Sequence, residues 1–191
     1  NMNYNAVGQI PLITVEAWIN TSETGTAEWD NWSIVDFDRS EYYNFFVRGD
    51  NGQVGFSTTD NGGVNHDFYS TTSVNDGNWH HIAAVYDGTD KVIYIDGIEE
   101  ARSNNSHGGN NLGRGTTRFG FIGDGSEASG FNGTRNYKYY NGFIDEVRIW
   151  NTVRTPTEIY NFRDTCLEGN EIGLAAYYNM NESSGSVITD I

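Results

Sequence analysis

Hydrophobic and polar positions alternate along this chain in short runs, which is the pattern of half-buried β-strands. Residues 14–19 alternate in this way, whereas Trp79–Tyr86 is apolar on both faces, as expected of a central strand that is covered on both sides. Turns rich in Gly, Asn and Asp separate the runs. The pattern predicts strands at 14–19, 32–37, 43–47, 53–58, 68–71, 79–86, 91–95, 98–102, 118–122, 143–150 and 174–178.

Two local motifs predict particular connections between these elements. Asp96-Gly97 lies between two β-rich runs and predicts a tight hairpin, because a type I′ turn needs positive φ at both central residues. After the 143–150 strand, Thr155, Pro156 and Glu158 form a capping box with proline at the first helical position. One short helix is therefore expected after Phe143–Trp150.

The composition agrees with an all-β protein of two antiparallel sheets. Aromatic residues make up 14% of the 191 residues, and there are 23 glycines but only 2 prolines. No linker divides the chain, so residues 1–191 are expected to form a single domain. The chain opens within a motif at Asn1, and we expect a monomeric module excised from a larger protein, with neighbouring domains of the same polypeptide as partners.

The formal net charge of −15 disfavours nucleic acid and anionic membranes as partners, because both need clustered Lys and Arg. Such a charge has two interpretations: it keeps the domain soluble, or its oxygen-rich loops bind Ca²⁺. No apolar run reaches transmembrane length, so membrane insertion is not expected. Cys166 is the single cysteine, so no internal disulfide forms, and no Cys/His spacing indicates zinc.

Four motifs in fixed order resemble the laminin-G-like branch of the concanavalin A-like lectin/glucanase superfamily, over roughly residues 12 to 162. The motifs are 78–88 (NWHHIAAVYDG), 92–97 (VIYIDG), 142–150 (GFIDEVRIW) and 155–159 (TPTEI). The resemblance implies a pentraxin-like jelly-roll sandwich and an extracellular location, secreted or attached to the cell surface. It also implies calcium and a glycan or protein ligand.

The segment 173–185 departs from the usual layout of that family, in which such a strand commonly stands at the start of a unit. It either begins the next repeat of an array or folds back to fill the first-strand position of this unit. We favour the second alternative, because an overhanging apolar strand would be an aggregation-prone edge.

Asp145 is the leading metal candidate. Strict alternation would place it on one face with Phe143, Val147 and Ile149, where a carboxylate is costly unless it is paired or bound to a metal. Laminarinase-like relatives carry an aspartate at a similar last-strand position that helps to hold a structural Ca²⁺. The alternative is a hydrogen-bonded aspartate at the entry of the strand.

A second calcium site is predicted at the rim of the sandwich. Asp38 and Glu41 follow one strand, close to Asp36, and Asp124 and Glu127 open the long loop 123–141. In pentraxins, loops at similar positions together bind calcium, although the acids of this chain do not reproduce that family's ligand pattern. Solvated turn acids are the alternative interpretation.

Aromatic and amide side chains predict a sugar-binding surface. Trp29, Asn31, Tyr137, Tyr139 and Asn141 are the candidates, because aromatic rings stack on sugar rings while amides bond hydroxyl groups. Trp32 and Tyr140 are expected in the core instead.

Several other residues are expected to have structural roles. Trp18, Trp79 and Trp150 are predicted to be core residues, Glu146 and Arg148 to form a surface ion pair, and His80 and His81 to point to opposite faces. His66 and His107 lie in Asn/Gly-rich loops and are expected to have no partners.

The sequence favours a non-catalytic carbohydrate-binding module, such as an accessory domain of a secreted polysaccharide-degrading enzyme. Asp36, Asp38 and Glu41 echo the three-acid strand of related glucanases, but the first acid is Asp rather than Glu, and Arg39-Ser40 breaks the alternation. A calcium-stabilised adhesion or spacer domain is the alternative function, and a glycoside hydrolase is a weaker one.

Overall fold

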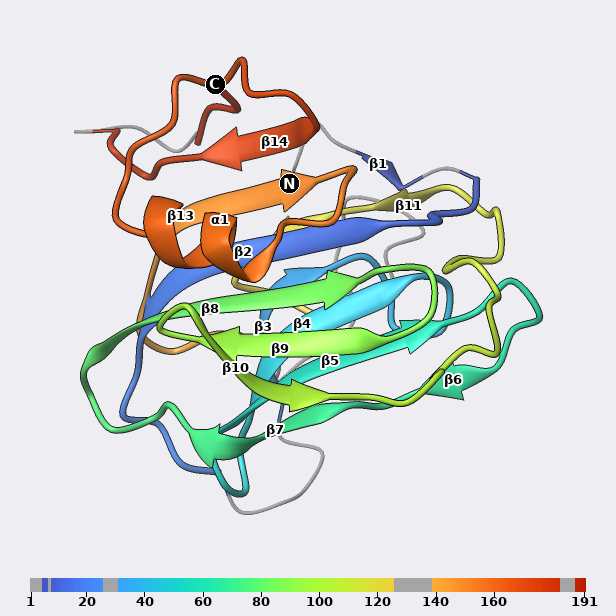
Figure 1. Ribbon diagram of the computed structural model, residues 1–191. Coiled ribbons are helices and arrows are strands. Elements are labelled where there is room, and N and C mark those ends of the chain that lie inside the picture. The colour runs from blue at the N-terminus through green and yellow to red at the C-terminus, as the bar shows by residue number, and fades with distance from the viewer. Residues whose placement is uncertain (1–4, 7, 26–30, 126–138, 183–187) are drawn as a thin grey trace.

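The computed structural model describes residues 5–6, 8–25, 31–125, 139–182 and 188–191. The fold is a jelly-roll sandwich of two antiparallel sheets that face each other, with a short helix on the outer face of one sheet (Figure 1). The predicted all-β fold class is confirmed. Strand boundaries also agree with the prediction to within a residue or two for most strands.

The first sheet has the strand order β10-β9-β8-β2-β13-β14. Its strands are β2 (Ile13–Asn20), β8 (Trp79–Tyr86), β9 (Lys91–Ile95), β10 (Ile98–Arg102), β13 (Phe143–Trp150) and β14 (Leu174–Tyr178). The second sheet has the order β12-β3-β4-β5-β6, and β7 also pairs with β5. Its strands are β3 (Asn31–Asp36), β4 (Tyr43–Arg48), β5 (Gln53–Thr59), β6 (Asn65–His66), β7 (Tyr69–Ser73) and β12 (Phe121–Ile122).

Two short strands, β1 (Asn5–Ala6) and β11 (Arg118–Phe119), form a separate pair. The predicted strand 118–122 is therefore wrong as a single element. Its first half pairs with β1, whereas its second half pairs with β3 in the second sheet. Strands β1 and β6 were not predicted, because two-residue strands carry too little pattern to detect.

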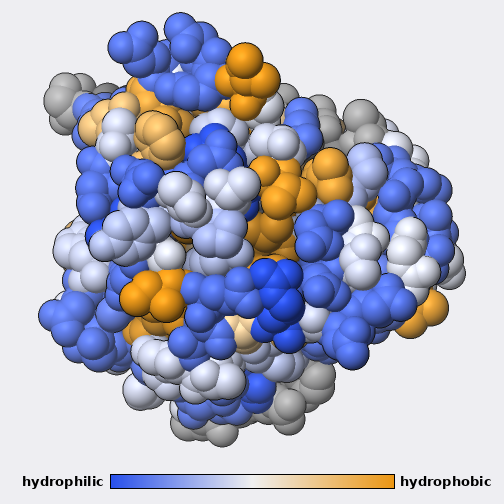
Figure 2. All heavy atoms as spheres, in the orientation of Figure 1, coloured by the Kyte–Doolittle hydropathy of each residue, from blue (hydrophilic) through white to orange (hydrophobic). Residues whose placement is uncertain are grey.

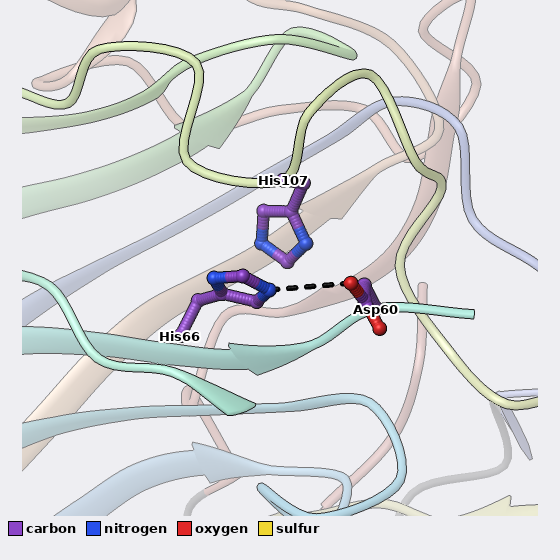
Figure 3. Close-up of side chains that lie close together, drawn as sticks. All are labelled: Asp60, His66 and His107. Carbon is purple, nitrogen blue, oxygen red and sulfur yellow. Dashed lines mark hydrogen bonds and ion pairs between the residues drawn. The ribbon is translucent and has the colours of Figure 1, made fainter. Parts of the chain in front are cut away.

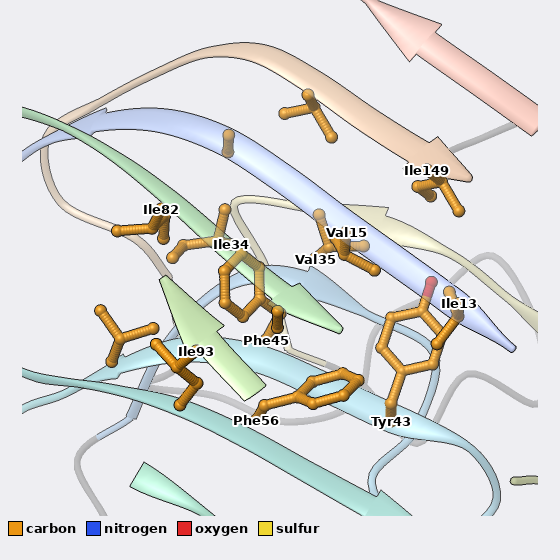
Figure 4. Packing of buried hydrophobic residues seen from close by; sticks show 14 of the residues in the cluster. Ile13, Val15, Ile34, Val35, Tyr43, Phe45, Phe56, Ile82, Ile93 and Ile149 are labelled. Carbon is orange, nitrogen blue, oxygen red and sulfur yellow. The ribbon is translucent and has the colours of Figure 1, made fainter. Parts of the chain in front are cut away.

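The core lies between the two sheets and is built from alternate residues of their strands (Figure 4). Val15 and Ile82 from the first sheet meet Val35, Phe45 and Phe56 from the second, and each of these side chains is fully buried. The ring of Phe56 stands at 90° to that of Phe45, with 6.3 Å between centroids. This continuous apolar layer fixes the register of both sheets, since a one-residue slip would turn it toward solvent.

The hairpin between β9 and β10 has the predicted turn chemistry. Asp96 and Gly97 both have positive φ, at 53° and 80°. A Cβ at position 97 would lie 2.9 Å from the Cα of Tyr160, so the turn also has no room for a side chain against the helix. Glycine is needed here for both reasons.

Helix α1 (Pro156–Phe162) begins at the predicted capping box, with both reciprocal bonds formed. The Thr155 hydroxyl accepts from the Glu158 amide at 3.2 Å, and the Glu158 carboxylate accepts from the Thr155 amide at 2.8 Å. Ile159 is 1% exposed and packs on the outer face of β8 and β9, against Ala83 and Val92. The helix thus covers one part of this outer face and leaves another part open.

Strand β14 pairs with β13 at the edge of the first sheet, from Val147 opposite Tyr178 to Trp150 opposite Leu174. The segment after the helix therefore folds back onto this domain, as in the favoured alternative. Within the described residues, no helix has both the length and the apolar character needed to cross a membrane.

Candidate functional site

A surface pocket of about 340 Å³ lies on the open part of the outer face of the first sheet. Its walls come from β2, β8, β13 and the segments that follow α1 and β14. The lining residues are Trp18, Trp79, Asp145, Glu146, Arg163, Asp164, Thr165, Cys166 and Asn181. Two indole rings, several carboxylates, a guanidinium group and an amide therefore converge on one cavity, which is the composition of a small polar-ligand site.

A β-bulge in β13 aims Asp145 into this pocket. Asp145 pairs with Trp18 and Arg148 pairs with Glu16, so β13 contains one residue more than β2 over this stretch. The bulge includes Glu146, whose backbone has a positive φ of 52°. The predicted shared face of Asp145 and Val147 is therefore wrong, because the bulge reverses the alternation and leaves Ile144 on the core side.

The bulge also changes the predicted surface ion pair. Arg148 donates to Glu146 at 2.7 Å, as expected, but the Arg148 side chain is only 1% exposed. Arg148 also donates to the carbonyls of Phe162 and Thr165, and Tyr177 donates its hydroxyl to Glu146. The pair is thus a buried clamp between β13, β14 and the end of α1, and the Glu146 carboxylate is already occupied.

Aromatic rings form one side of the pocket, where the sequence predicted core residues. Trp79 is 46% exposed and lies next to Phe143, which is 67% exposed, with 6.2 Å between ring centroids. Trp18 is partly buried, donates its Nε1–H to the Arg163 carbonyl at 2.8 Å and packs edge-on against His81. The prediction of Trp79 and Trp18 as core residues is wrong, because both lie on the outer face beyond the area that α1 covers. Trp150, at 1% exposed, is a core residue as predicted.

Asp145 is partly buried at the edge of the pocket. Burial raises the pKa of its carboxyl above the ordinary value, and the hydrogen bond from the Glu146 amide offsets this only in part. No ion pair to Asp145 is formed by the described residues. A partly buried carboxylate without an ion pair is stabilised when a ligand hydroxyl donates to it or a cation binds it.

The predicted rim residues separate into two groups at opposite ends of β3. Phe121 pairs with Asp36 and Ile122 with Val35, so Asp124 lies beside the start of β3, whereas Asp38 follows its end. Asp124 and Asp38 therefore do not converge. Trp29, Tyr137 and Glu127 lie outside the described residues.

The first group, at the start of β3, includes three predicted ligand-binding residues. Tyr139 is 58% exposed, and Asn141 donates to Glu23 at 2.6 Å. Asn31 is 7% exposed, and its Oδ1 atom has no hydrogen-bond partner among the described residues. The buried Oδ1 of Asp124 is likewise unpaired within that part of the chain. A ligand could donate hydrogen bonds to these unpaired acceptors, so the loop rim is an alternative ligand-binding site to the pocket.

The second group is held by arginine. Arg118 Nε lies 3.0 Å from Asp38 Oδ2, and Arg118 Nη2 lies 3.1 Å from Glu41 Oε1. Asp38 has φ of 67° and also accepts from the amide and hydroxyl of Ser40. The Arg118 guanidinium therefore already pairs with both acids, and Ca²⁺ at this position would have to displace it.

The oxygen donors around Asp145 and at the rim meet the requirements of a calcium site only in part. Ca²⁺ takes six to eight oxygens, yet within the described residues no group of three carboxylates lies close enough together to share an ion. Asp145 has a solvent-facing carboxylate, and Asn181 and Asp164 line the same pocket. These are the described side chains that would hold calcium near Asp145.

A histidine cluster that the sequence analysis missed lies at the β5–β6 end of the second sheet. His66 and Asp60 are 3.3 Å apart, and the rings of His66 and His107 lie 4.2 Å apart, so the prediction that both histidines have no partner is wrong. Burial, with the charges of His66 and Lys91, lowers the pKa of His107 to about 3. The loop 103–117 brings His107 to this position from far along the chain.

The match to known families decides the identity of the fold. The model of the concanavalin A-like lectin/glucanases superfamily, in its laminin G form, matches residues 6–160. The chain belongs to this superfamily.

Solved structures resemble the chain at low sequence identity. A candidate carbohydrate-binding protein from Bacteroides ovatus matches with a TM-score of 0.70 and 21% identity, over 99% of this chain and 53% of that protein. A heptameric SAP-like pentraxin from Limulus polyphemus matches with a TM-score of 0.58 and 16% identity, over 88% and 76% of the two chains. The binding domain of Paraclostridial Mosquitocidal Protein 1 matches with a TM-score of 0.56 and 13% identity, over 86% and 42%. The chain thus spans about half the length of the Bacteroides protein, and at these identities the likeness extends to the fold alone.

The acids that echo the catalytic strand of concanavalin A-like glucanases do not lie on one strand. Asp36 ends β3, and Asp38 follows in a left-handed turn in which its own amide donates to Asp36. Glu41 and Asp38 are both bonded to Arg118. A nucleophile and an acid/base at alternate strand positions are therefore not formed by these three residues.

His80, next to the pocket residue Trp79, provides a test of the local electrostatics. Burial alone would lower its pKa, but bonds to Asp96 at 2.9 Å and Asp76 at 3.2 Å outweigh burial and raise it. The stability from protonated His80 is thus fully present below about pH 6.5 and is lost as pH rises through the higher folded-state pKa. We expect an NMR titration to give a His80 pKa above 6.5, and His80→Gln to remove this part of the pH dependence of unfolding. A measured pKa at or below 6.5 would contradict the assignment.

Proposed function

We propose that this domain is a non-catalytic carbohydrate-binding module of a secreted or cell-surface protein, and that sugar binds at the pocket beside Trp79. One observation carries the proposal: the exposed ring of Trp79, with Phe143 beside it, borders a cavity that is also lined by Trp18 and by several charged and polar side chains. Sugar rings offer C–H faces that stack on aromatic rings and hydroxyl groups that bond carboxylates and amides. The fold of the superfamily and the Bacteroides relative are consistent with this role.

The charges around the pocket favour a neutral sugar chain. Asp145 and Asp164 contribute negative charge, Arg163 contributes one positive charge, and Glu146 is neutralised by Arg148. The whole chain carries a formal net charge of −15, which repels polyanionic polysaccharides. On the face shown in Figure 2, apolar side chains form small patches among polar ones.

The test is isothermal titration against a panel of neutral and acidic soluble polysaccharides, with and without chelator. We expect a neutral polysaccharide to bind and Trp79→Ala to weaken binding about tenfold, since a lost stacking contact is worth roughly 1.4 kcal/mol. Ile172→Ala is the matched control, because Ile172 is 96% exposed and lies outside the pocket. Loss of binding in Tyr139→Ala, with Trp79→Ala unaffected, would place the sugar on the loop rim instead.

Calcium at Asp145 is part of the proposal as a structural ion. In that case calcium chloride added after chelator treatment raises the melting temperature of the wild type, and Asp145→Asn abolishes this increase. A chelation effect without any glycan binding would favour the adhesion or spacer function. No binding across the panel would count against a carbohydrate-binding module.

A further inference from the structure

Asp60, His66 and His107 bring three ligand atoms together at the β5–β6 end of the sandwich, away from the sugar pocket (Figure 3). One atom from each residue lies within 4.8 Å of the others. Asp60 follows β5, His66 is the last residue of β6, and His107 comes from the loop after β10. From the coordination chemistry of these donors we infer that they form a site for one divalent transition metal ion, with Zn²⁺ as the preferred ion.

The spacing of the donors suits such an ion. Ligand atoms about 2.0–2.1 Å from a tetrahedral Zn²⁺ lie roughly 3.3–3.4 Å from one another. Asp60 Oδ2 and His66 Nε2 are 3.3 Å apart, which is already this separation. The ring of His107 lies over the pair in Figure 3 and completes a triangle of donors.

His107 supplies the observation that points most directly to a ligand. Its side chain is 2% exposed, and its Nδ1 atom has no hydrogen-bond partner within the described part of the chain. A buried polar nitrogen without a partner is costly, and binding a metal ion removes that cost.

The other nitrogen of His107 lies in a hydrogen-bond network with Thr58, Lys91 and His66. Nε2 lies 2.7 Å from the Thr58 hydroxyl, which also accepts from the Lys91 ammonium at 3.2 Å and faces the His66 carbonyl at 3.4 Å. A metal ion at Nδ1 requires the proton of His107 on Nε2. The Thr58 hydroxyl can accept from Nε2 when it donates its own proton to the His66 carbonyl.

Asp60 is held in the same manner. Its Oδ1 atom accepts from the amides of Gly62 and Val64, both at 2.9 Å, which leaves Oδ2 for the ion. The Asp60 side chain is 6% exposed and that of His66 is 23% exposed, so the site is buried on one side and open to solvent on the other. Three protein ligands leave a fourth position for water. A bound ion would connect the β5–β6 turn to the loop 103–117.

The test uses the whole chain in a Cys166→Ser background, because Cys166 is exposed and can bind metal on its own. After chelator treatment and dialysis, zinc chloride is titrated calorimetrically, with calcium and magnesium chloride in parallel. We expect one Zn²⁺ per chain and a higher melting temperature with zinc, and neither calcium nor magnesium chloride should displace zinc from this site.

Variants assign the ligands. His107→Gln and His66→Gln should each weaken zinc binding at least tenfold, and His80→Gln, at a histidine outside the cluster, should leave it unchanged. If His107→Gln fails to fold, the partly exposed His66 still provides the test. Co²⁺ in place of zinc should give the visible absorption of a tetrahedral nitrogen/oxygen site. Absence of stoichiometric zinc binding, or zinc binding that survives in His66→Gln, would overturn the proposal.

Discussion

Replacing Arg148 by alanine should lower the free energy of unfolding by about 3–5 kcal/mol, the usual cost of breaking a buried ion pair from one side. The Arg148 side chain is 1% exposed and bonds Glu146 at 2.7 Å. It also donates to the carbonyls of Phe162 and Thr165, which follow β13 by more than ten residues. The variant leaves a carboxylate and two carbonyls without their cation, and it detaches the end of α1 from the sheet.

The measurement is urea unfolding followed by circular dichroism. Arg102→Ala is the matched control, because Arg102 also bonds a glutamate at 2.7 Å, but both side chains are about 40% exposed. An exposed pair contributes about 0–1 kcal/mol. Equal losses in the two variants would show that Arg148 is not the clamp described above. Because Glu146 lines the sugar pocket, Arg148→Ala should also weaken glycan binding.

Replacing Phe45 by alanine should cost about 3–5 kcal/mol, through lost burial and the cavity that remains. Phe45 is fully buried at the centre of the sandwich and packs edge-on against Phe56 (Figure 4). Neighbours from two sheets surround it, so the site cannot collapse without shifting whole strands.

Unfolding midpoints and slopes in urea measure this effect. Phe45→Leu keeps most of the volume and should lose clearly less stability than Phe45→Ala. Ile172→Ala, at a position that is 96% exposed, should change stability by no more than about 0.5 kcal/mol. A loss below about 1 kcal/mol in Phe45→Ala would contradict the packing described for the core.

The strands that could be predicted are those with strong local patterns. Trp79–Tyr86, Lys91–Ile95, Ile98–Arg102 and Phe143–Trp150 have the predicted bounds, because alternation, turn chemistry and burial agree along each of them. The capped helix is of the same kind, since its start depends on Thr155 and Glu158 three residues apart.

The candidate site was much less predictable. Asp145 was identified, but on the wrong face, because the bulge at Glu146 depends on register against β2 and has no local pattern. Trp79 was placed in the core, because the sequence cannot show how far α1 extends over the sheet. Asp38 and Glu41 were read as calcium ligands, and their arginine partner comes from a strand about eighty residues later.

The histidine cluster shows the same limit. No Cys/His spacing in the sequence indicates zinc, because such patterns detect only ligands at short fixed separations. Here Asp60 and His66 are close in sequence, but His107 is joined to them by the fold of a long loop.

By itself, the sequence determined the all-β class, most strands, the hairpin turn, the capped helix and the superfamily. The strands, the turn and the helix depend on residues within one turn or one strand of each other, and the superfamily resemblance depends on the order of four such local motifs. The tertiary structure decided which side chains meet: the pocket around Trp79 and Asp145, the buried Arg148 clamp, and the cluster of Asp60, His66 and His107. Each of these joins segments distant in the chain, and their contacts are set by sheet register and packing, which local patterns do not encode.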